Sequence, residues 1–229
     1  MPRIVYVMDP YCPWCFAGSE TVQRLLRDYA DKVEFYLLPA SMLTHEYAFA
    51  YSPCQEAKQL ASLARIEQAT GAHFGEGYRQ TLKTEDEMWD STLSCRALEA
   101  VRRVDAFQLF AYAHALLQAR FVDGCSLQDE TVFLTLAKHF NLDMERFLTA
   151  YRSEEVAEAV VKNFTLVDDY AEVYPTLCYE DNSVKNRIEE GQGTYTEVAE
   201  RLNALLVGAQ PTEKSVLKRG GCSGGVCEL

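Results

Sequence analysis

Two cysteines near the N-terminus are the residues best suited to carry chemistry. Cys12 and Cys15, separated by Pro13 and Trp14, follow an apolar run and precede a helical pattern. Backbone N–H groups at a helix N-terminus are unpaired and partly positive, so they stabilise a thiolate at Cys12. Pro13 fits the first helical turn, where its missing N–H costs no hydrogen bond. Cys15 follows within about one turn and can attack a mixed disulfide on Cys12, which predicts a nucleophile and a resolving thiol.

A Cys-x-x-Cys pair has other uses, which the surrounding sequence makes less favourable. A structural zinc site needs two further ligands at suitable spacing. The histidines are dispersed and none lies beside the motif: His45, His73, His114 and His139. An inert structural disulfide is rare in the cytosol. Between a strand and a helix of a βαβ unit, the motif is typical of a redox centre, and we expect no metal there.

A second close pair of cysteines lies near the C-terminus. Cys222 and Cys227 stand among four glycines, which give a chain the freedom to reach another site or to close a small loop. One interpretation is a second redox pair that exchanges disulfides with Cys12 and Cys15. Metal capture by the two thiolates and an incidental disordered tail are the alternatives.

Four of the eight cysteines occur singly: Cys54, Cys95, Cys125 and Cys178. A lone cysteine in a helical or strand pattern usually behaves as a small buried apolar residue. We expect this of the first three. We also expect Cys178 to be buried, on a strand beside the redox pair.

The elements that position these cysteines follow from hydrophobic periodicity. Residues 3–8 and 33–39 read as strands, and residues 16–30 between them read as an amphipathic helix. Strand, helix and strand within about 40 residues form a βαβ unit, which implies parallel strand pairing.

From residue 53 to residue 152 the strand signals vanish. Helices are expected over residues 54–70, 91–104, 106–121, 127–140 and 143–151. Ser126 is the expected N-cap of the fourth of these helices. The remainder of the chain reads as a helix over 153–173 capped by Ser153, strands over 176–179 and 183–188, and a last helix over 194–206.

This order predicts an α/β protein with a thioredoxin-like fold and an inserted all-helical domain. Residues 1–52 and 153–208 would form the discontinuous thioredoxin-like domain. Residues 53–152 would form the helical insertion, and residues 209–229 a flexible cysteine-containing tail. Once the helical block is removed, the order βαβ–α–ββ–α remains, and it is that of the thioredoxin-like fold.

Composition restricts the partners and the compartment. The 229 residues are 48% hydrophobic and 24% charged, with a formal net charge of −12. A chain this acidic is not expected to bind nucleic acid, because phosphate binding needs clustered lysine and arginine. No apolar run reaches the roughly 18 residues that a membrane span requires. The cysteine motif follows the N-terminus too closely to leave room for a secretory signal, so we expect a cytoplasmic protein.

The segment from Asp9 to Phe16, which contains Cys-Pro-Trp-Cys, resembles the active-site entry of DsbA-like thioredoxin-fold oxidoreductases, especially their FrnE-like cytosolic branch. The stretches 121–124, 142–148 and 174–176 follow that branch's order. The resemblance implies that Pro175 is a cis-proline facing the cysteine pair. It also implies that Tyr174 touches the active-site sulfur and helps to select substrate, at a position where small or β-branched residues are common.

The residues and the resemblance together predict a thiol–disulfide oxidoreductase or isomerase that acts on protein or small-molecule disulfides. It would need no cofactor beyond its redox-active disulfide, recycled by glutathione or a thioredoxin-type reductant. The oligomeric state stays open. A glutathione-dependent isomerase or kappa-class glutathione transferase has a similar layout, but generally has serine at the first motif position and lacks the second cysteine. A thiol-based metal or oxidant sensor is the non-enzymatic alternative.

Overall fold

A computed structural model describes most of the chain. The described residues are 1–44, 47–182, 184–191, 193–208, 217–218, 221–223 and 226–228. Within this part of the chain, no helix combines the length and apolar character that crossing a bilayer requires.

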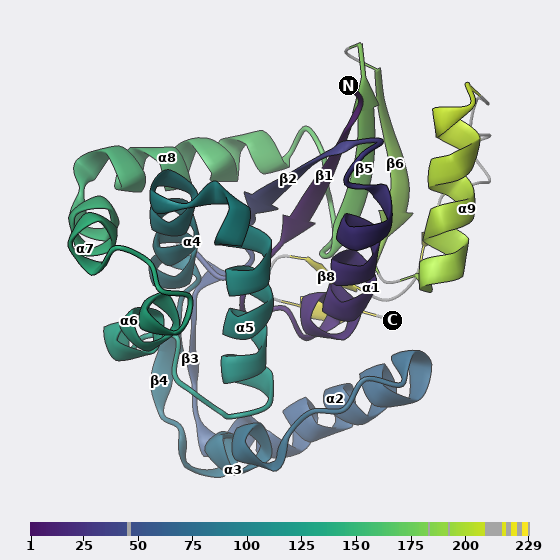
Figure 1. Cartoon of the computed structure of the whole chain (residues 1–229). Coiled ribbons are helices and arrows are strands. Elements are labelled where there is room, and N and C mark those ends of the chain that lie inside the picture. Colours follow the sequence, from purple (N-terminus) through teal and green to yellow (C-terminus); the bar gives the residue numbers. More distant parts are fainter. Residues whose placement is uncertain are drawn as a thin grey trace.

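A five-stranded sheet forms the centre of the thioredoxin-like part (Figure 1). Its strands, in spatial order, are β2 (Glu34–Pro39), β1 (Arg3–Met8), β5 (Thr176–Asp181), β6 (Val184–Glu190) and β7 (Leu217–Lys218). β1 and β2 pair in parallel, which confirms the predicted βαβ unit. β5 lies antiparallel to both β1 and β6, so the chain segments before and after the helical block meet side by side in one sheet.

Two helices pack beside this sheet. α1 (Pro13–Tyr29) buries Val22, Leu25 and Tyr29 at helical spacing, and Tyr29 Oη donates to the carbonyl of Ala199 at 3.4 Å. Ala199 belongs to α9 (Tyr195–Leu206), whose N-cap Thr194 forms a reciprocal capping box with Glu197. These contacts fix the direction of α1, and therefore the position of its first turn.

The helical block lies on the other side of the sheet from α9 in Figure 1. Its helices are α2 (Glu56–Thr70), α3 (Glu76–Thr84), α4 (Thr92–Val104), α5 (Leu109–Phe121), α6 (Glu130–His139) and α7 (Met144–Arg152), followed by α8 (Glu154–Val167). Short 3-10 turns, Pro53–Gln55 and Ala106–Gln108, precede α2 and α5. The five helices expected between residues 53 and 152 are all present.

Four features of this region differ from the sequence prediction. A two-stranded sheet, β3 (Phe49–Tyr51) with β4 (Glu87–Trp89), and the helix α3 were not expected. Strands of three residues are too short to show a period, and their partners lie more than 30 residues apart. The N-cap of α6 is Asp129, whose side chain accepts from the N–H of Thr131, because the helix begins at Glu130 and not directly after Ser126. The hydroxyl of Ser126 donates to the Glu87 carboxylate, at 2.9 and 2.7 Å. α8 ends at Val167 rather than at residue 173.

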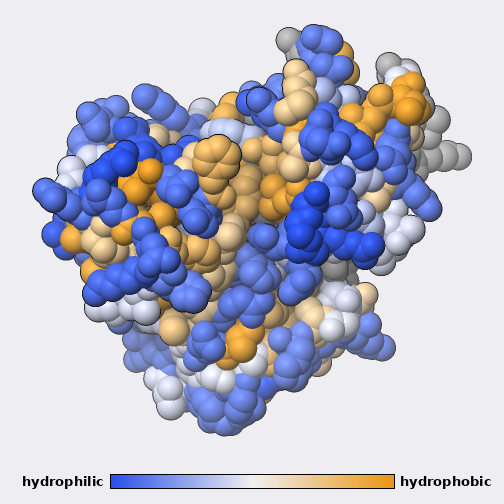
Figure 2. Space-filling model, viewed as in Figure 1, coloured by the Kyte–Doolittle hydropathy of each residue, from blue (hydrophilic) through white to orange (hydrophobic). Residues whose placement is uncertain are grey.

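Buried side chains from the sheet, α1 and the helical block form one continuous cluster. Phe16 of α1 contacts Phe74 and Phe121, with ring centroids 5.0 and 5.4 Å apart. Gln23 Nε2 of α1 also donates to the carbonyl of Phe110 at 3.0 Å. Figure 2 shows hydrophilic residues over most of one face, with apolar residues interspersed among them.

Candidate active site

Cys12 stands at the junction between β1 and α1, as the sequence predicts. It is the N-cap residue of α1, with an extended backbone (φ −85°, ψ 112°), and Pro13 begins the helix. The backbone N–H of Cys15 donates to Cys12 Sγ at 3.3 Å. This N–H is one of those that a helix leaves unpaired at its start, and a bond from it stabilises negative charge on the sulfur.

Cys15 has a different environment, although it lies only one turn away. Both cysteines are free thiols, and neither is exposed to solvent. Burial raises the pKa of the Cys15 thiol well above its usual range, and the neighbouring Cys12 raises it further. Cys15 is therefore held in its neutral form, which suits a group that attacks second. Trp14, between them, is also buried.

The loop before β5 brings a distant segment to Cys12. The peptide bond between Tyr174 and Pro175 is cis, as the resemblance implies. Cys12 Sγ donates to the carbonyl oxygen of Tyr174 at 3.4 Å, although the two residues are 162 positions apart. β1 and β5 lie antiparallel with Val7 opposite Thr176, so the end of β1 necessarily meets the start of β5.

Asp9 is a site residue that the sequence reasoning missed. Its carboxylate is buried and accepts hydrogen bonds from the backbone N–H groups of Tyr11 (2.8 Å) and Met42 (3.0 Å). It also accepts from Ser91 Oγ at 2.9 Å. Burial raises the pKa of Asp9 to about 7 despite these bonds. The available signal was an acidic residue directly after an apolar strand, but the sequence does not show that its carboxylate is buried.

A buried arginine behind Tyr11 was also missed. Arg120 has no exposed surface and binds both carboxylate oxygens of Glu85 at 2.8 Å. Its guanidinium lies over the rings of Tyr11 (5.3 Å) and Trp89 (4.8 Å). Burial by itself lowers the pKa of Arg120, but the bonds and charge of Glu85 outweigh it, so the group stays charged. Tyr11 therefore connects the cysteine motif to a charged cluster inside the helical block.

The tail cysteine Cys222 also reaches this region. It is buried and disulfide-bonded, and it belongs to β8 (Gly221–Ser223), which pairs antiparallel with β9 (Val226–Glu228). In this hairpin Cys222 is opposite Cys227, whose side chain lies outside the described residues. The N–H of Tyr174 donates to the Cys222 carbonyl at 2.8 Å, and the Cys222 N–H donates back at 3.0 Å. Cys12 and Cys222, one from each cysteine pair of the sequence, therefore both form a hydrogen bond to Tyr174.

The single cysteines follow the sequence expectation only in part. Cys95 and Cys178 are buried, as expected, and burial raises the pKa of Cys178 to about 11. Cys125 is half-buried, and Cys54 is exposed, so the expectation was wrong for Cys54. Cys54 lies in the 3-10 turn before α2, on the outer surface, where its Sγ contacts Ser52 Oγ at 2.9 Å.

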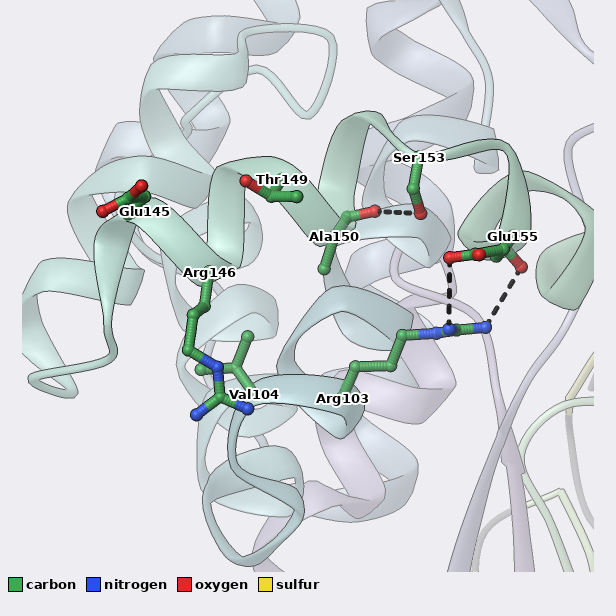
Figure 3. Close-up of a pocket in the computed structure, with 8 residues that line it drawn as sticks. All are labelled: Arg103, Val104, Glu145, Arg146, Thr149, Ala150, Ser153 and Glu155. Carbon is green, nitrogen blue, oxygen red and sulfur yellow. Dashed lines mark hydrogen bonds and ion pairs between the residues drawn. The ribbon is translucent and has the colours of Figure 1, made fainter.

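An open pocket of about 370 Å³ lies elsewhere, where α4 meets α7 and α8 (Figure 3). Arg103 reaches across it and donates to the carbonyl of Glu155 at 3.2 Å. Arg146 projects toward Val104 from the opposite wall. Its described lining holds neither cysteine nor histidine, so the cysteine pair remains the candidate centre for chemistry.

Comparison with known families gives one match. A family model described as a DSBA-like thioredoxin domain matches residues 3–171. No curated protein sequence matches the chain.

Solved structures share the fold at low sequence identity. Cytosolic disulfide reductase DsbM from Pseudomonas aeruginosa has a TM-score of 0.76 and 21% identity, over 90% of this chain and 98% of its own. A candidate protein disulfide isomerase from Nitrosomonas europaea has a TM-score of 0.80 and 19% identity, over 90% of this chain and 98% of its own. A candidate DsbA oxidoreductase from Streptomyces coelicolor has a TM-score of 0.66 and 17% identity, over 100% of this chain and 99% of its own.

Proposed function

Since the chain belongs to the family of DSBA-like thioredoxin domains and is a protein-disulfide oxidoreductase of the DsbA-like type, we propose that Cys12 and Cys15 carry its thiol–disulfide exchange. The observation that carries this proposal is the contrast between the two thiols. Cys12 receives a hydrogen bond from a helix N-terminal N–H, whereas burial keeps Cys15 protonated. Protein or small-molecule disulfides are the substrates.

The exchange takes two steps in the reducing direction. The Cys12 thiolate attacks one sulfur of the substrate disulfide, a Cys12–substrate disulfide forms, and the other substrate sulfur leaves as a thiolate that takes a proton from water. Cys15 then gives its proton to water and attacks Cys12 Sγ, and the second substrate sulfur leaves as a thiolate that takes up a proton from water. Two electrons have moved to the substrate, and Cys12 and Cys15 are joined by a disulfide. The reverse sequence oxidises a dithiol.

Tyr174 and Pro175 hold the substrate beside Cys12 in this proposal. The contact between Cys12 Sγ and the Tyr174 carbonyl supports it, because a substrate sulfur bonded to Cys12 would lie against the same backbone. Pro13 and Trp14 set the geometry of the helix start between the two cysteines.

We propose that Cys222 and Cys227 form a second redox pair that exchanges with the first. The position of Cys222 against Tyr174 supports this role. Attack of the Cys12 thiolate on Cys222 Sγ would form a Cys12–Cys222 disulfide and break the proposed Cys222–Cys227 bond, with Cys227 leaving as a thiolate. Attack of Cys15 on Cys12 Sγ would then release Cys222 as the second thiolate. The active-site pair would end oxidised and the tail pair reduced, with two electrons transferred between them.

Glutathione or a thioredoxin-type reductant is the proposed source of electrons, and the cytoplasm the proposed compartment. Two observations on the structural neighbour DsbM support this reductant and this compartment. DsbM is named a cytosolic disulfide reductase, and a second structure of it contains GSH.

Reduction of insulin by the full chain, with dithiothreitol as electron source, tests the main proposal. Cys12→Ser should abolish turnover, and Cys15→Ser mixed with insulin in the absence of dithiothreitol should accumulate a mixed disulfide on Cys12 that mass mapping detects. Cys54→Ser is the matched control, because Cys54 is an exposed free thiol away from the pair. Loss of activity equal in Cys54→Ser and Cys12→Ser would contradict the assignment. Glutathione conjugation that survives Cys15→Ala would favour a transferase instead.

A further inference from the structure

The cysteine pair is closed to solvent in this structure. Cys12 and Cys15 are both 0% exposed, and Tyr174 beside them is 8% exposed. Attack on an external disulfide requires the substrate sulfur to contact Cys12 Sγ directly. The arrangement therefore describes a closed form, and some group must leave before a large substrate can enter.

The tail strand β8 is the group that occupies this edge. Tyr174 and Cys222 exchange two backbone hydrogen bonds, which is the pattern of an antiparallel strand pair. Cys222 is 0% exposed and belongs to the same buried cluster as Cys12. Both backbone polar groups of Tyr174 are thereby engaged by a segment that lies 48 positions later in the chain.

A strand edge of this kind, when nothing occupies it, binds extended peptides by adding a strand. Main-chain hydrogen bonds supply the affinity, and side-chain positions supply the selectivity. The residue of β8 that meets Tyr174 is itself a cysteine in a disulfide. The tail therefore presents, beside Cys12, the same groups that an extended polypeptide with a disulfide-bonded cysteine would present.

We propose that β8 is an internal occupant of the polypeptide-binding edge at Tyr174, and that a protein substrate enters only when its own cysteine-bearing segment displaces the tail. This inference rests on the proposed function. A tethered segment competes at an effective concentration on the order of millimolar. A small disulfide forms no strand pair with Tyr174, so it does not compete with β8 for these backbone hydrogen bonds. The tail therefore selects against polypeptides that bind weakly to this edge.

Two variants of the full chain separate the strand pairing from the sulfur chemistry. Cys222→Pro removes the sulfur and the N–H that bonds to Tyr174, and its ring crowds the Tyr174 carbonyl. Cys222→Ser removes the sulfur and keeps the N–H. Both lack the proposed shuttle cysteine, so any difference between them reports the docked strand.

The first measurement is hydrogen–deuterium exchange at the Tyr174 amide. We expect exchange in Cys222→Pro at least tenfold faster than in Cys222→Ser. The second is the KM for insulin reduction with dithiothreitol, which we expect to be about fivefold lower in Cys222→Pro. The KM for bis(hydroxyethyl) disulfide should differ less than twofold between the variants.

Equal amide exchange in the two variants, or equal KM values for insulin, would overturn the proposal. A KM that falls equally for insulin and for the small disulfide would also overturn it, because the tail would then be a general cover. Absence of any Cys12-dependent exchange in the wild-type chain would overturn the proposed function and the competition together. In that case the Tyr174 amide would still report whether the strand is docked.

Discussion

Asp9 shows how a single residue beside the cysteine motif links acidity to stability. Three hydrogen bonds hold its buried carboxylate, from Tyr11, Met42 and Ser91. These bonds favour the charged form, but burial outweighs them and raises the pKa from 3.8 to about 7. The folded protein therefore binds a proton at Asp9 more tightly than the unfolded chain does.

This difference predicts a pH-dependent effect of Asp9→Asn. The stabilisation from the raised pKa is complete below about pH 4 and is lost as the pH rises through about 7. At about 1.4 kcal/mol per pKa unit, the loss is up to roughly 4 kcal/mol in the wild type. Asparagine does not titrate, so this loss should be absent in the variant. Urea unfolding of both proteins at pH 5 and pH 8 measures the part of this loss that falls between the two pH values, about 3 kcal/mol. A stability difference between the two proteins that is the same at both pH values would contradict the prediction.

The place of the cysteine pair between a strand and a helix could be predicted from the sequence, because the motif and the periodicity around it are local signals. The cis form of Pro175 was implied by the family resemblance. The significance of Asp9 and Arg120 could not be predicted, because it comes from burial. Asp9 meets Ser91 across 82 positions, and Arg120 meets Glu85 across 35. One sequence gives no measure of which acidic or basic residue will lose contact with water.

Glycines at the start of α3 allow this helix to pack against the end of α5. A Cβ on Gly77 would lie 2.4 Å from the carbonyl oxygen of Asp123, and one on Gly75 would lie 2.3 Å from that of Val122. Both neighbours are backbone atoms, which cannot rotate away as a side chain can. Gly71, at the C-cap of α2, has a positive φ of 74° but nothing within 4 Å of its Cβ position.

Gly77→Ala should therefore destabilise the fold more than Gly71→Ala. In an open helix, alanine in place of glycine stabilises by up to about 1 kcal/mol. Here the backbone overlap should dominate and cost about 3 kcal/mol, whereas Gly71→Ala should cost about 1 kcal/mol for its left-handed backbone. Thermal and urea unfolding compare the two. A neutral or stabilising Gly77→Ala would show that the α3–α5 contact is looser than described.

The ion pair between Arg120 and Glu85 fixes α5 to the end of α3. Glu85→Gln would leave a fully buried guanidinium without its charge partner, which typically costs about 3–5 kcal/mol. Glu130→Gln is the matched control, since its pair with Arg152 is exposed and worth less than about 1 kcal/mol. Similar unfolding midpoints for both variants in urea at pH 7 would exclude a structural role for the buried pair.

Long helices of the block were predictable because each carries apolar residues at helical spacing. The short elements β3, β4 and α3 were not, because each depends on a distant partner: Tyr51 Oη donates to the Leu82 carbonyl at 2.6 Å. Tertiary contacts of this kind decide whether segments as short as these strands of three residues and this helix of nine form regular secondary structure. The local sequence pattern does not show such contacts.

At the scale of the whole molecule, the inserted helices and the thioredoxin-like part share one core. The ring of Trp89 in β4 lies 5.8 Å from that of Tyr11 and stacks on Tyr51 at 4.4 Å. Ser91, at the start of α4, bonds to Asp9 beside the cysteine motif. Domains with separate cores unfold separately, whereas a shared core favours one cooperative transition. The domain boundaries predicted from the sequence, at residues 52/53 and 152/153, describe the order of the segments along the chain. They do not predict whether these segments unfold together.

The only two tryptophans answer that question, because Trp14 lies in α1 and Trp89 in the helical block. Trp89→Phe leaves a fluorescence reporter in the thioredoxin-like part, and Trp14→Phe leaves one in the insertion. In each variant, urea unfolding followed by fluorescence should coincide with unfolding followed by far-ultraviolet circular dichroism, with midpoints within about 0.2 M. Each variant is compared only with itself, so a loss of stability from the substitution does not disturb the comparison. If Trp89 fluorescence changes at clearly lower urea than the helical signal, the insertion unfolds first and the shared core does not couple the two parts.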